Sequence, residues 1–148
     1  MHYDALVRTV AHRVGLGDPA QAERATRTAL RLLPPRLPEP VMRRLTRQLD
    51  PSLAGALSSR LPPPADTTGD DYVADLAERC GLDAVRAARV ARVVLQALEV
   101  DTAGELSRVP HSQLPEDVRD LLRRRTAPGR AARLGRQVRE GRRVTRAA

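Results

Sequence analysis

The sequence contains no Phe, Trp, Ile, Lys or Asn, and its only aromatic residues are Tyr3 and Tyr72. The hydrophobic residues, which make up 41% of the 148, are therefore mainly Leu, Val and Ala. β-Strands favour β-branched and aromatic side chains, and here only Val supplies these in quantity. Because small aliphatic side chains suit closely packed helices, the composition predicts an all-α fold.

The sequence also lacks the residue clusters of common active sites. Cys80 is the only cysteine, which excludes an internal disulfide and any metal cage built from several cysteines. His2, His12 and His111 are scattered, without a partner at metal-ligand spacing. Neither a glycine-rich phosphate loop nor a nucleophile elbow is present. We therefore expect no metal, no cofactor, no small-molecule substrate and no catalytic residues, and predict that the chain is not an enzyme.

Long apolar runs are absent as well. No segment has the length of continuous apolar sequence that a membrane-spanning helix requires. The first ten residues, MHYDALVRTV, lack the basic region and the apolar core of a secretory signal peptide. We therefore expect a cytoplasmic protein.

Two distant stretches of the chain resemble each other. Residues 22–57 align without a gap with residues 87–122, an offset of 65 positions, and nine of the thirty-six pairs are identical. One further residue of shift aligns VAHRVGL, from Val10, with LAERCGL, from Leu76. Because two copies are too few for a solenoid, we interpret the pattern as an internal duplication.

Each copy is predicted to contain four helices. Asp18 and Asp83 are expected to cap the second helix of their copies, and Gly15 to end the first helix in a left-handed conformation. Thr102 and Glu105 have the spacing of a capping box for the third helix of the second copy. The predicted helices cover about 3–14, 18–33, 38–49 and a short segment from 51, and then start at 70 or 71, at 83 (running to about 98), at 102 and at 115.

The predicted architecture is accordingly all-α, with two tandem related lobes of about four helices each that form one compact helical body. A flexible, arginine-rich C-terminal tail is expected to follow this body. The predicted boundaries are 1–60 for helical repeat 1, 61–70 for a proline-rich linker, 71–122 for helical repeat 2 and 123–148 for the tail.

The net charge of +8 is unevenly distributed along the chain. All 26 basic residues are arginines, and the missing lysines indicate a high-GC genome rather than a functional choice. Residues 1–60 carry +5, residues 61–122 carry −6, and residues 123–148 carry +9. The two-copy body is therefore almost neutral, and the basic character belongs to the tail.

Two groups of arginines are candidate contacts for an anionic partner. Blocks of like charge commonly form interaction arms, although they also occur as solvated segments without a partner. The tail has no aromatic residue for base stacking, so nucleic-acid binding through it would be nonspecific. The candidates are Arg123, Arg124, Arg125, Arg130, Arg133, Arg136, Arg139, Arg142, Arg143 and Arg146 in the tail, with Arg24, Arg27 and Arg31 as a secondary stripe on the polar side of the second helix.

The order of motifs resembles a known bacterial family. YDALVRTVAHRVGL, ERATRTALRLL and RQLDPSL follow one another and return as YVADLAERCGL, AARVARVVLQAL, GEL and SQLPEDVRDLL. This order is similar to domain-of-unknown-function family 2267 (DUF2267), a duplicated all-helical family, over about residues 1–122. The resemblance implies a helical fold without assigning any catalytic residue.

Charge and composition together favour a noncatalytic helical interaction module. In this hypothesis the body binds a protein partner or a second copy of itself, and the tail contacts an anionic surface. The alternative is a nonspecific, nucleoid-type DNA- or RNA-binding protein, in which Arg24, Arg27 and Arg31 extend the basic surface of the tail.

Overall fold

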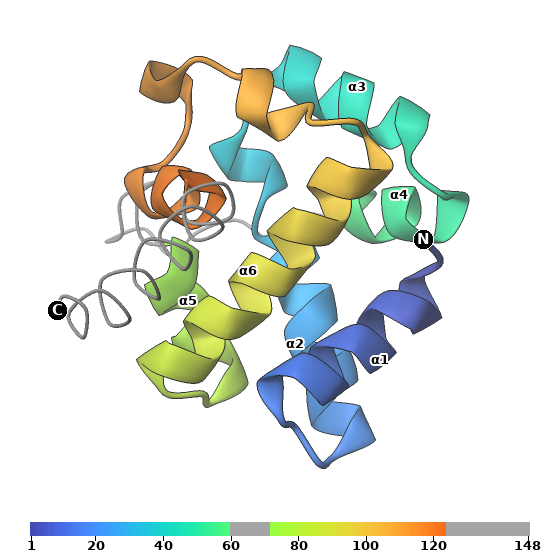
Figure 1. The fold of residues 1–148 in the computed structure, drawn as a ribbon, viewed down its shortest axis with the longest axis vertical. Coiled ribbons are helices and arrows are strands. Elements are labelled where there is room, and N and C mark those ends of the chain that lie inside the picture. The colour runs from blue at the N-terminus through green and yellow to red at the C-terminus, as the bar shows by residue number, and fades with distance from the viewer. Residues whose placement is uncertain (60–71, 124–148) are drawn as a thin grey trace, which may run out of the picture.

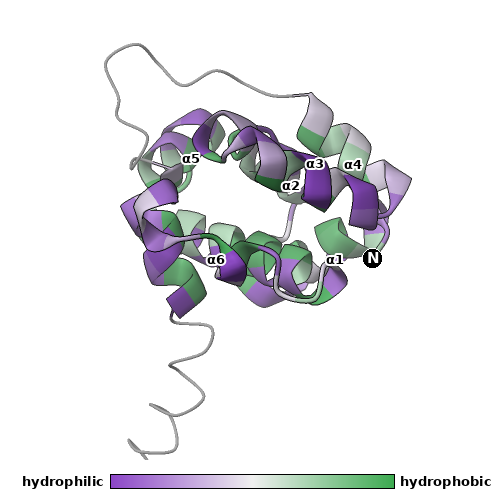
Figure 2. Ribbon diagram, turned by 90° about the horizontal axis from the view of Figure 1, so that it is seen from above, coloured by the Kyte–Doolittle hydropathy of each residue, from purple (hydrophilic) through white to green (hydrophobic). Residues whose placement is uncertain are grey.

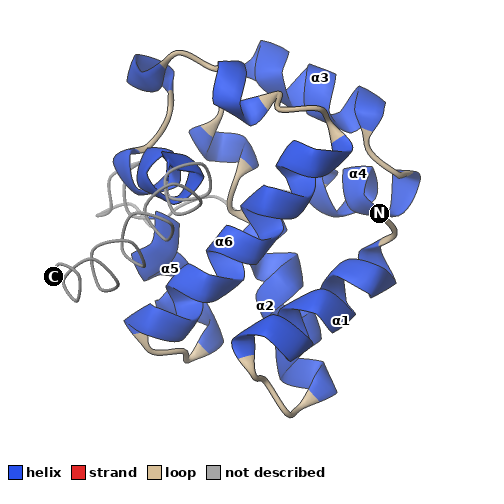
Figure 3. Cartoon of the chain, in the orientation of Figure 1, coloured by secondary structure: helices blue, strands red, loops and turns tan. Residues whose placement is uncertain are grey.

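The computed structural model of the chain describes residues 1–59 and 72–123, here called the first half and the second half. Within these ranges all regular secondary structure is helical, as Figure 3 shows, and the all-α prediction is confirmed. The predicted linker at 61–70 and the tail beyond Arg123 lie outside the described residues. The elements are α1 (Tyr3–Val14), α2 (Pro19–Arg31), η1 (Pro34–Arg36), α3 (Glu39–Gln48), α4 (Pro51–Ser58), α5 (Tyr72–Cys80), α6 (Ala84–Asp101), η2 (Leu106–Arg108), η3 (His111–Gln113) and a helix over 116–123, where η marks a 3₁₀ turn.

Aspartates cap the starts of three helices, and glycines follow the ends of two. Asp18 and Asp83 cap α2 and α6, since each side chain accepts a hydrogen bond from a backbone N–H in the first turn. Asp50 caps α4 in the same way. Gly15 (φ 83°) follows α1 and Gly81 (φ 64°) follows α5, in the left-handed region that glycine adopts without strain.

Four helices form the centre of the molecule (Figure 1). The helix α1 packs on α2 and α6, the helix α5 packs on α6 and α2, and α2 contacts α6. In Figure 2, α1 and α6 lie in one row and α5, α2 and α4 lie in the other. The helix α4 packs on α2, and α3 packs on α4. Because α1 contacts α6 and α5 contacts α2, the first helix of each half packs on the long helix of the other half.

The core is built from the aliphatic faces of the two long helices. Small alanines on these faces let the helices approach closely, while the valines and leucines fill the space between them. Tyr72 is fully buried, and its hydroxyl donates to the backbone carbonyl of Ala29 at 2.7 Å. The buried residues include Ala22, Ala25, Thr26, Ala29 and Leu30 on α2, and Ala87, Val90, Ala91, Val94, Leu95 and Leu98 on α6.

The predicted third helix of the second half is wrong. Ala103 (φ 54°) and Gly104 (φ 84°) reverse the chain after α6, and only the 3₁₀ turns η2 and η3 follow. Thr102 does not act as an N-cap, because its hydroxyl donates to the carbonyl of Leu98 at 2.6 Å. A helix through this segment would contain Pro110, which lacks an N–H and clashes with the preceding turn.

The two long helices end differently. The helix α2 stops at Arg31, slightly before the predicted end, because Pro34 and Pro35 follow and form a 3₁₀ turn with Arg36. The helix α6 continues to Asp101, past the predicted end near Leu98. At the offset of 65 positions, Glu99 replaces Pro34, so nothing interrupts α6 at that point.

Candidate functional site

The predicted arginine stripe lies on the outer side of α2. Arg24 and Arg27 are exposed and Arg31 is half-buried, opposite the aliphatic face that packs into the core. The structure brings Arg27 and Arg31 to the same pocket. Arg24 lies one turn earlier on the helix and does not line this pocket. Two of the three arginines of the stripe therefore share a site.

This arginine pocket lies where α1, α2 and α4 meet. It encloses about 370 Å³ and opens to solvent. That volume is at the lower end of the range of small-molecule sites in proteins. The lining residues are Tyr3 from α1, Glu23, Arg27 and Arg31 from α2, and Ser52, Gly55, Ala56 and Ser59 from and just after α4.

One wall of the arginine pocket is an interaction of Tyr3, Glu23 and Arg27. The Tyr3 hydroxyl lies 3.2 Å from Oε2 of Glu23, and the Arg27 guanidinium pairs with the same carboxylate one helical turn along α2. Hydrogen bonding from Arg27 lowers the pKa of Glu23. Partial burial raises the pKa of Tyr3, which keeps the phenol protonated at neutral pH. This wall therefore presents a hydroxyl and a guanidinium that is already balanced by a carboxylate.

Arg31 lies one turn after Arg27 on α2 and contacts the end of α4. Arg31 donates from Nε to the backbone carbonyl of Ser59 at 2.5 Å, which fixes the guanidinium at the rim. Ser52 accepts a hydrogen bond from the backbone N–H of Tyr3 at 2.9 Å and thereby joins α4 to the start of α1. Among the residues that the structure describes, no carboxylate pairs with Arg31. Within the described part of the chain, Arg31 thus contributes to the pocket a charge that no carboxylate balances.

The chemistry of this arrangement suits an anionic group. A guanidinium fixed through Nε still has its two terminal nitrogens, whose planar fork matches a carboxylate or a phosphate. Arg27 supplies further N–H donors to the same opening, whereas the Tyr3 hydroxyl already donates to Glu23. The arginine pocket is therefore able to bind an anion, and its residues include no pair of groups arranged for nucleophilic attack.

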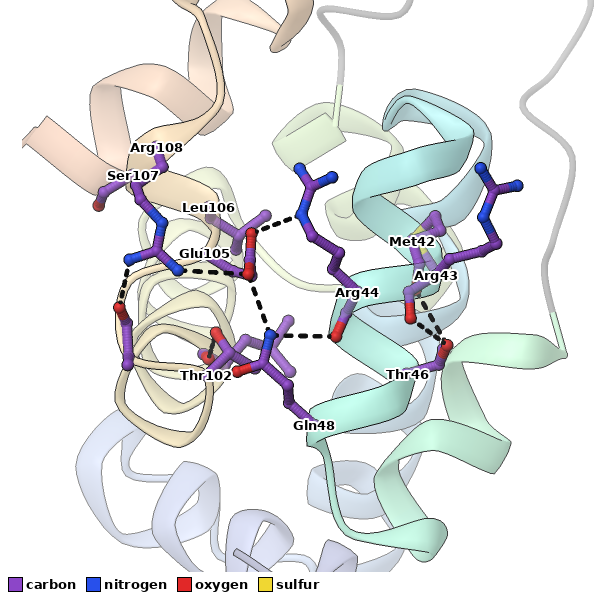
Figure 4. Close-up of polar contacts among 12 residues, drawn as sticks. Met42, Arg43, Arg44, Thr46, Gln48, Thr102, Glu105, Leu106, Ser107 and Arg108 are labelled. Atoms are coloured by element: carbon purple, nitrogen blue, oxygen red, sulfur yellow. Dashed lines mark hydrogen bonds and ion pairs between the residues drawn. The ribbon is translucent and has the colours of Figure 1, made fainter.

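A second polar cluster joins the two halves (Figure 4). Glu105, whose side chain is 8% exposed, accepts hydrogen bonds from Arg44 Nε at 2.9 Å and from Gln48 Nε2 at 3.0 Å on α3. Arg108 approaches the same carboxylate to 3.2 Å and donates to the carbonyl of Ala103. The hydrogen bond from Arg44 lowers the pKa of Glu105. Glu105 is thus fully engaged inside the protein and serves the fold.

A third cluster is buried between η1 and α5. Arg36 and Asp75 approach to 3.3 Å, with both side chains 1% exposed. Arg79 donates from Nε to the other carboxylate oxygen of Asp75 at 2.7 Å, and the Arg36 guanidinium lies 5.8 Å from the centre of the Tyr72 ring. Because no solvent reaches the Arg36–Asp75 pair, it holds the two halves together rather than binding a ligand.

The tail arginines and the three histidines do not contribute to the arginine pocket in the described part of the chain. Arg123 ends the helix over 116–123, is exposed and pairs with Asp120 at 2.5 Å. The nine tail arginines from Arg124 to Arg146 lie outside the described residues. His12 and His111 are exposed, while His2 caps α1 by accepting from the backbone N–H of Asp4.

Across residues 1–59 and 72–123, His, Cys, Asp and Glu side chains form no group of three or more that would hold a metal ion. In the same ranges, none of the helices is long and apolar enough to cross a membrane.

Several residues of the arginine pocket were not foreseen from the sequence. Tyr3, Ser52, Gly55 and Ser59 come from α1 and α4, which no sequence pattern placed beside the arginines of α2. Weak signals existed, because Tyr3 is one of only two aromatic residues and Gly55 interrupts an expected helix. Neither signal indicates a neighbour on α2.

Comparisons with known proteins identify the family but no function. No curated protein and no solved structure matches the chain. A family model does match, over residues 3–121, and its description is "Uncharacterized conserved protein (DUF2267)". The match covers most of the chain and agrees with the resemblance in the motifs, so the protein belongs to the DUF2267 family.

Proposed function

We propose that this protein is a noncatalytic interaction module that binds an anionic partner, in the first place a protein. The helical body offers the arginine pocket, and the tail, with ten arginines against one acidic residue, adds a sequence-independent electrostatic attraction. A cytoplasmic location and the absence of catalysis are parts of the same proposal.

The observation that carries the proposal is the position of Arg31. Its guanidinium is fixed at the rim of an open pocket by Ser59, without a carboxylate partner among the described residues. The other arginine of the pocket, Arg27, is by contrast paired with Glu23. An arginine that is positioned but not neutralised is suited to a charged group on another molecule.

The alternative function is nonspecific binding to DNA or RNA through the tail. Its support is the segmentation of charge, since residues 123–148 carry +9 while the rest of the chain is nearly neutral. In that case affinity would fall steeply with salt, because each neutralised phosphate releases a counterion. The sequence of the nucleic acid would have little effect.

The experiment that separates the two functions is a pull-down with the full chain, with and without nuclease treatment of the extract. Three variants are compared with the unchanged protein: Arg27→Gln with Arg31→Gln in the pocket, Arg43→Gln with Arg47→Gln as a matched charge control on α3, and Arg133→Gln, Arg136→Gln, Arg139→Gln and Arg142→Gln in the tail.

A protein that stays bound after nuclease treatment, and is lost with the pocket variant but not with the α3 control, supports the interaction module. If all bound material disappears on nuclease treatment and with the tail variant, the nucleic-acid function is correct. Equal retention by all variants would contradict both proposals.

The proposal also includes an internal duplication as the origin of the helical body. Helices of the two halves that correspond at an offset of 65 or 66 positions, α1 with α5 and α2 with α6, make corresponding contacts. The contact of α1 with α6 matches that of α5 with α2. This pattern supports two related lobes in which each first helix packs on the long helices of both lobes, as an internal duplication would produce.

A further inference from the structure

Gly55 is an unexpected residue at its position. It lies inside α4, where a glycine destabilises a helix relative to alanine because of its greater backbone freedom. Its backbone does not have a positive φ, and a Cβ added to it would meet no atom within 4 Å. Neither the local conformation nor the packing of the protein therefore requires a glycine here.

The location of Gly55 supplies a reason. It lines the arginine pocket next to Ala56, between Ser52 and Ser59 on successive turns of the chain. These small side chains form the surface opposite Arg27 and Arg31. A residue without a side chain at this point lets another molecule come close to the backbone of α4 while it contacts the arginines.

The second half contains no counterpart of this arrangement. At the offset of 65 positions, Gly55 corresponds to Asp120 and Arg31 to Gln96. Asp120 pairs with Arg123, so an acidic side chain stands where the first half has an open surface. The combination of a glycine with an unneutralised arginine is therefore confined to the first half. It belongs to that half rather than to a framework common to both.

We propose that the arginine pocket is a binding site for a single carboxylate or phosphate group, which Arg31 receives through its terminal nitrogens above Gly55. This inference rests on the proposed function and names the group of the partner that the body recognises. Glu23 already balances Arg27, so the pocket has one excess positive charge and suits one anionic group. Tyr3 and Arg27 line the same pocket beside Arg31.

The same anion is available from two sources, a free small molecule or an acidic side chain of a protein. The pocket volume of about 370 Å³ accepts either a small organic acid or phosphate ester, or a glutamate side chain with its flanking backbone. Three probes distinguish the sources: acetate, inorganic phosphate and a blocked peptide with a central glutamate.

The test is an NMR titration of the full chain, in which the Arg31 Nε–H and the Gly55 amide are followed at constant ionic strength. Saturable shifts at both groups are expected with at least one probe. Gly55→Asp, which reproduces the residue of the second half, is expected to weaken binding at least tenfold. Ser58→Asp adds the same charge to α4 outside the pocket and is expected to change the affinity less than twofold.

Arg31→Gln provides a second variant that does not depend on how α4 tolerates an aspartate. Followed at the Gly55 amide, it should likewise weaken binding at least tenfold. Tighter binding of the peptide than of either free anion assigns the site to a protein side chain, and the reverse order assigns it to a small molecule. The site is wrong if no probe saturates, or if Gly55→Asp and Ser58→Asp bind equally well.

The pull-down tests the interaction module and the titration tests the single-anion site, so either proposal can be rejected without the other. A partner that is captured through the arginines while no probe saturates would keep the interaction module and remove the single-anion site. Saturable binding of acetate or phosphate without any captured partner would keep the site and remove the interaction module.

Discussion

Ser52 and Asp117, which lie 65 positions apart, each accept a hydrogen bond from a backbone N–H at the start of the first helix of their own half. Ser52 Oγ accepts from Tyr3 at 2.9 Å, and Asp117 Oδ2 accepts from Val73 at 2.8 Å. Ser52 is the second residue of α4, and Asp117 is the second residue of the helix over 116–123. The last helix of each half thus caps the first helix of that half.

Ser52→Ala is predicted to lower the free energy of unfolding by about 1 kcal/mol, the usual cost of losing a side-chain cap at a helix N-terminus. The measurement is urea denaturation followed by circular dichroism. Ser58→Ala is the control, because its exposed hydroxyl bonds only to a carbonyl within α4. An equal effect of the two substitutions would contradict a capping role for Ser52.

Asp117→Ser is predicted to change how stability depends on pH. Burial raises the pKa of Asp117 above its ordinary value of 3.8, although the backbone N–H groups of Val73 and Val118 oppose this. Ionisation is therefore less favourable in the folded chain, and stability falls as the pH rises from 3.8 through the raised pKa. Serine removes this loss and keeps a cap, so the variant should gain stability relative to the unchanged protein over that pH range. Parallel denaturation curves at each pH would refute the prediction.

Asp75→Leu is predicted to destabilise the protein by about 3–5 kcal/mol, because it removes one member of an ion pair in which both side chains are 1% exposed. Arg43→Ala breaks an exposed pair with Glu39 at 3.9 Å and should cost at most about 1 kcal/mol. Denaturant midpoints of the two variants give the comparison. A difference of less than about 1 kcal/mol between them would show that burial does not control the effect.

Glu105→Gln is predicted to lower the free energy of unfolding at neutral pH but not in acid. The hydrogen bond from Arg44 lowers the pKa of Glu105 below 4.5, so the ionised carboxylate stabilises the fold above pH 4.5. This contribution disappears as the pH falls through the lowered pKa. The variant should therefore be less stable at pH 7, and the difference should shrink below pH 4.5. Glu78 is exposed and lies outside this cluster, so Glu78→Gln measured alongside is the control for the loss of one carboxylate.

Gly55→Ala is predicted to raise the free energy of unfolding by about 0.4–1 kcal/mol, because it restricts the unfolded chain and adds a methyl group in open space. If the arginine pocket binds an anion above Gly55, the same variant should bind it more weakly. Thermal denaturation and the NMR titration on one sample measure both effects. A loss of stability would show that α4 itself requires the glycine.

The helices were largely predictable because their signals are local. Asp18 and Asp83 each precede an apolar segment with helical periodicity and cap the helix there. Gly15 ends α1 because it adopts a positive φ. The third helix of the second half failed for a local reason as well. The spacing of Thr102 and Glu105 predicts a helix start, but Pro110 lacks the N–H that a helix through this segment needs, and only 3₁₀ turns form.

The arginine pocket could be predicted only in part. Helical periodicity places Arg27 and Arg31 on the outer side of α2, and the structure agrees. Periodicity does not show which other helix borders that side. Tyr3 and Gly55 are separated by 52 positions in the sequence and meet at the pocket only through the packing of α1 and α4 on α2. Such a site depends on tertiary contacts that a single sequence does not reveal.

The first helix of each half packs on the long helix of the other half as well as on that of its own half, and this determines how the molecule can come apart. A fragment ending before residue 60 would leave α2 without α5, and a fragment beginning after residue 71 would leave α6 without α1. Each fragment would expose the aliphatic stripe of its longest helix to water. Separate fragments should therefore be unstable alone and recover helicity when mixed, as complementary pieces of one cooperative unit.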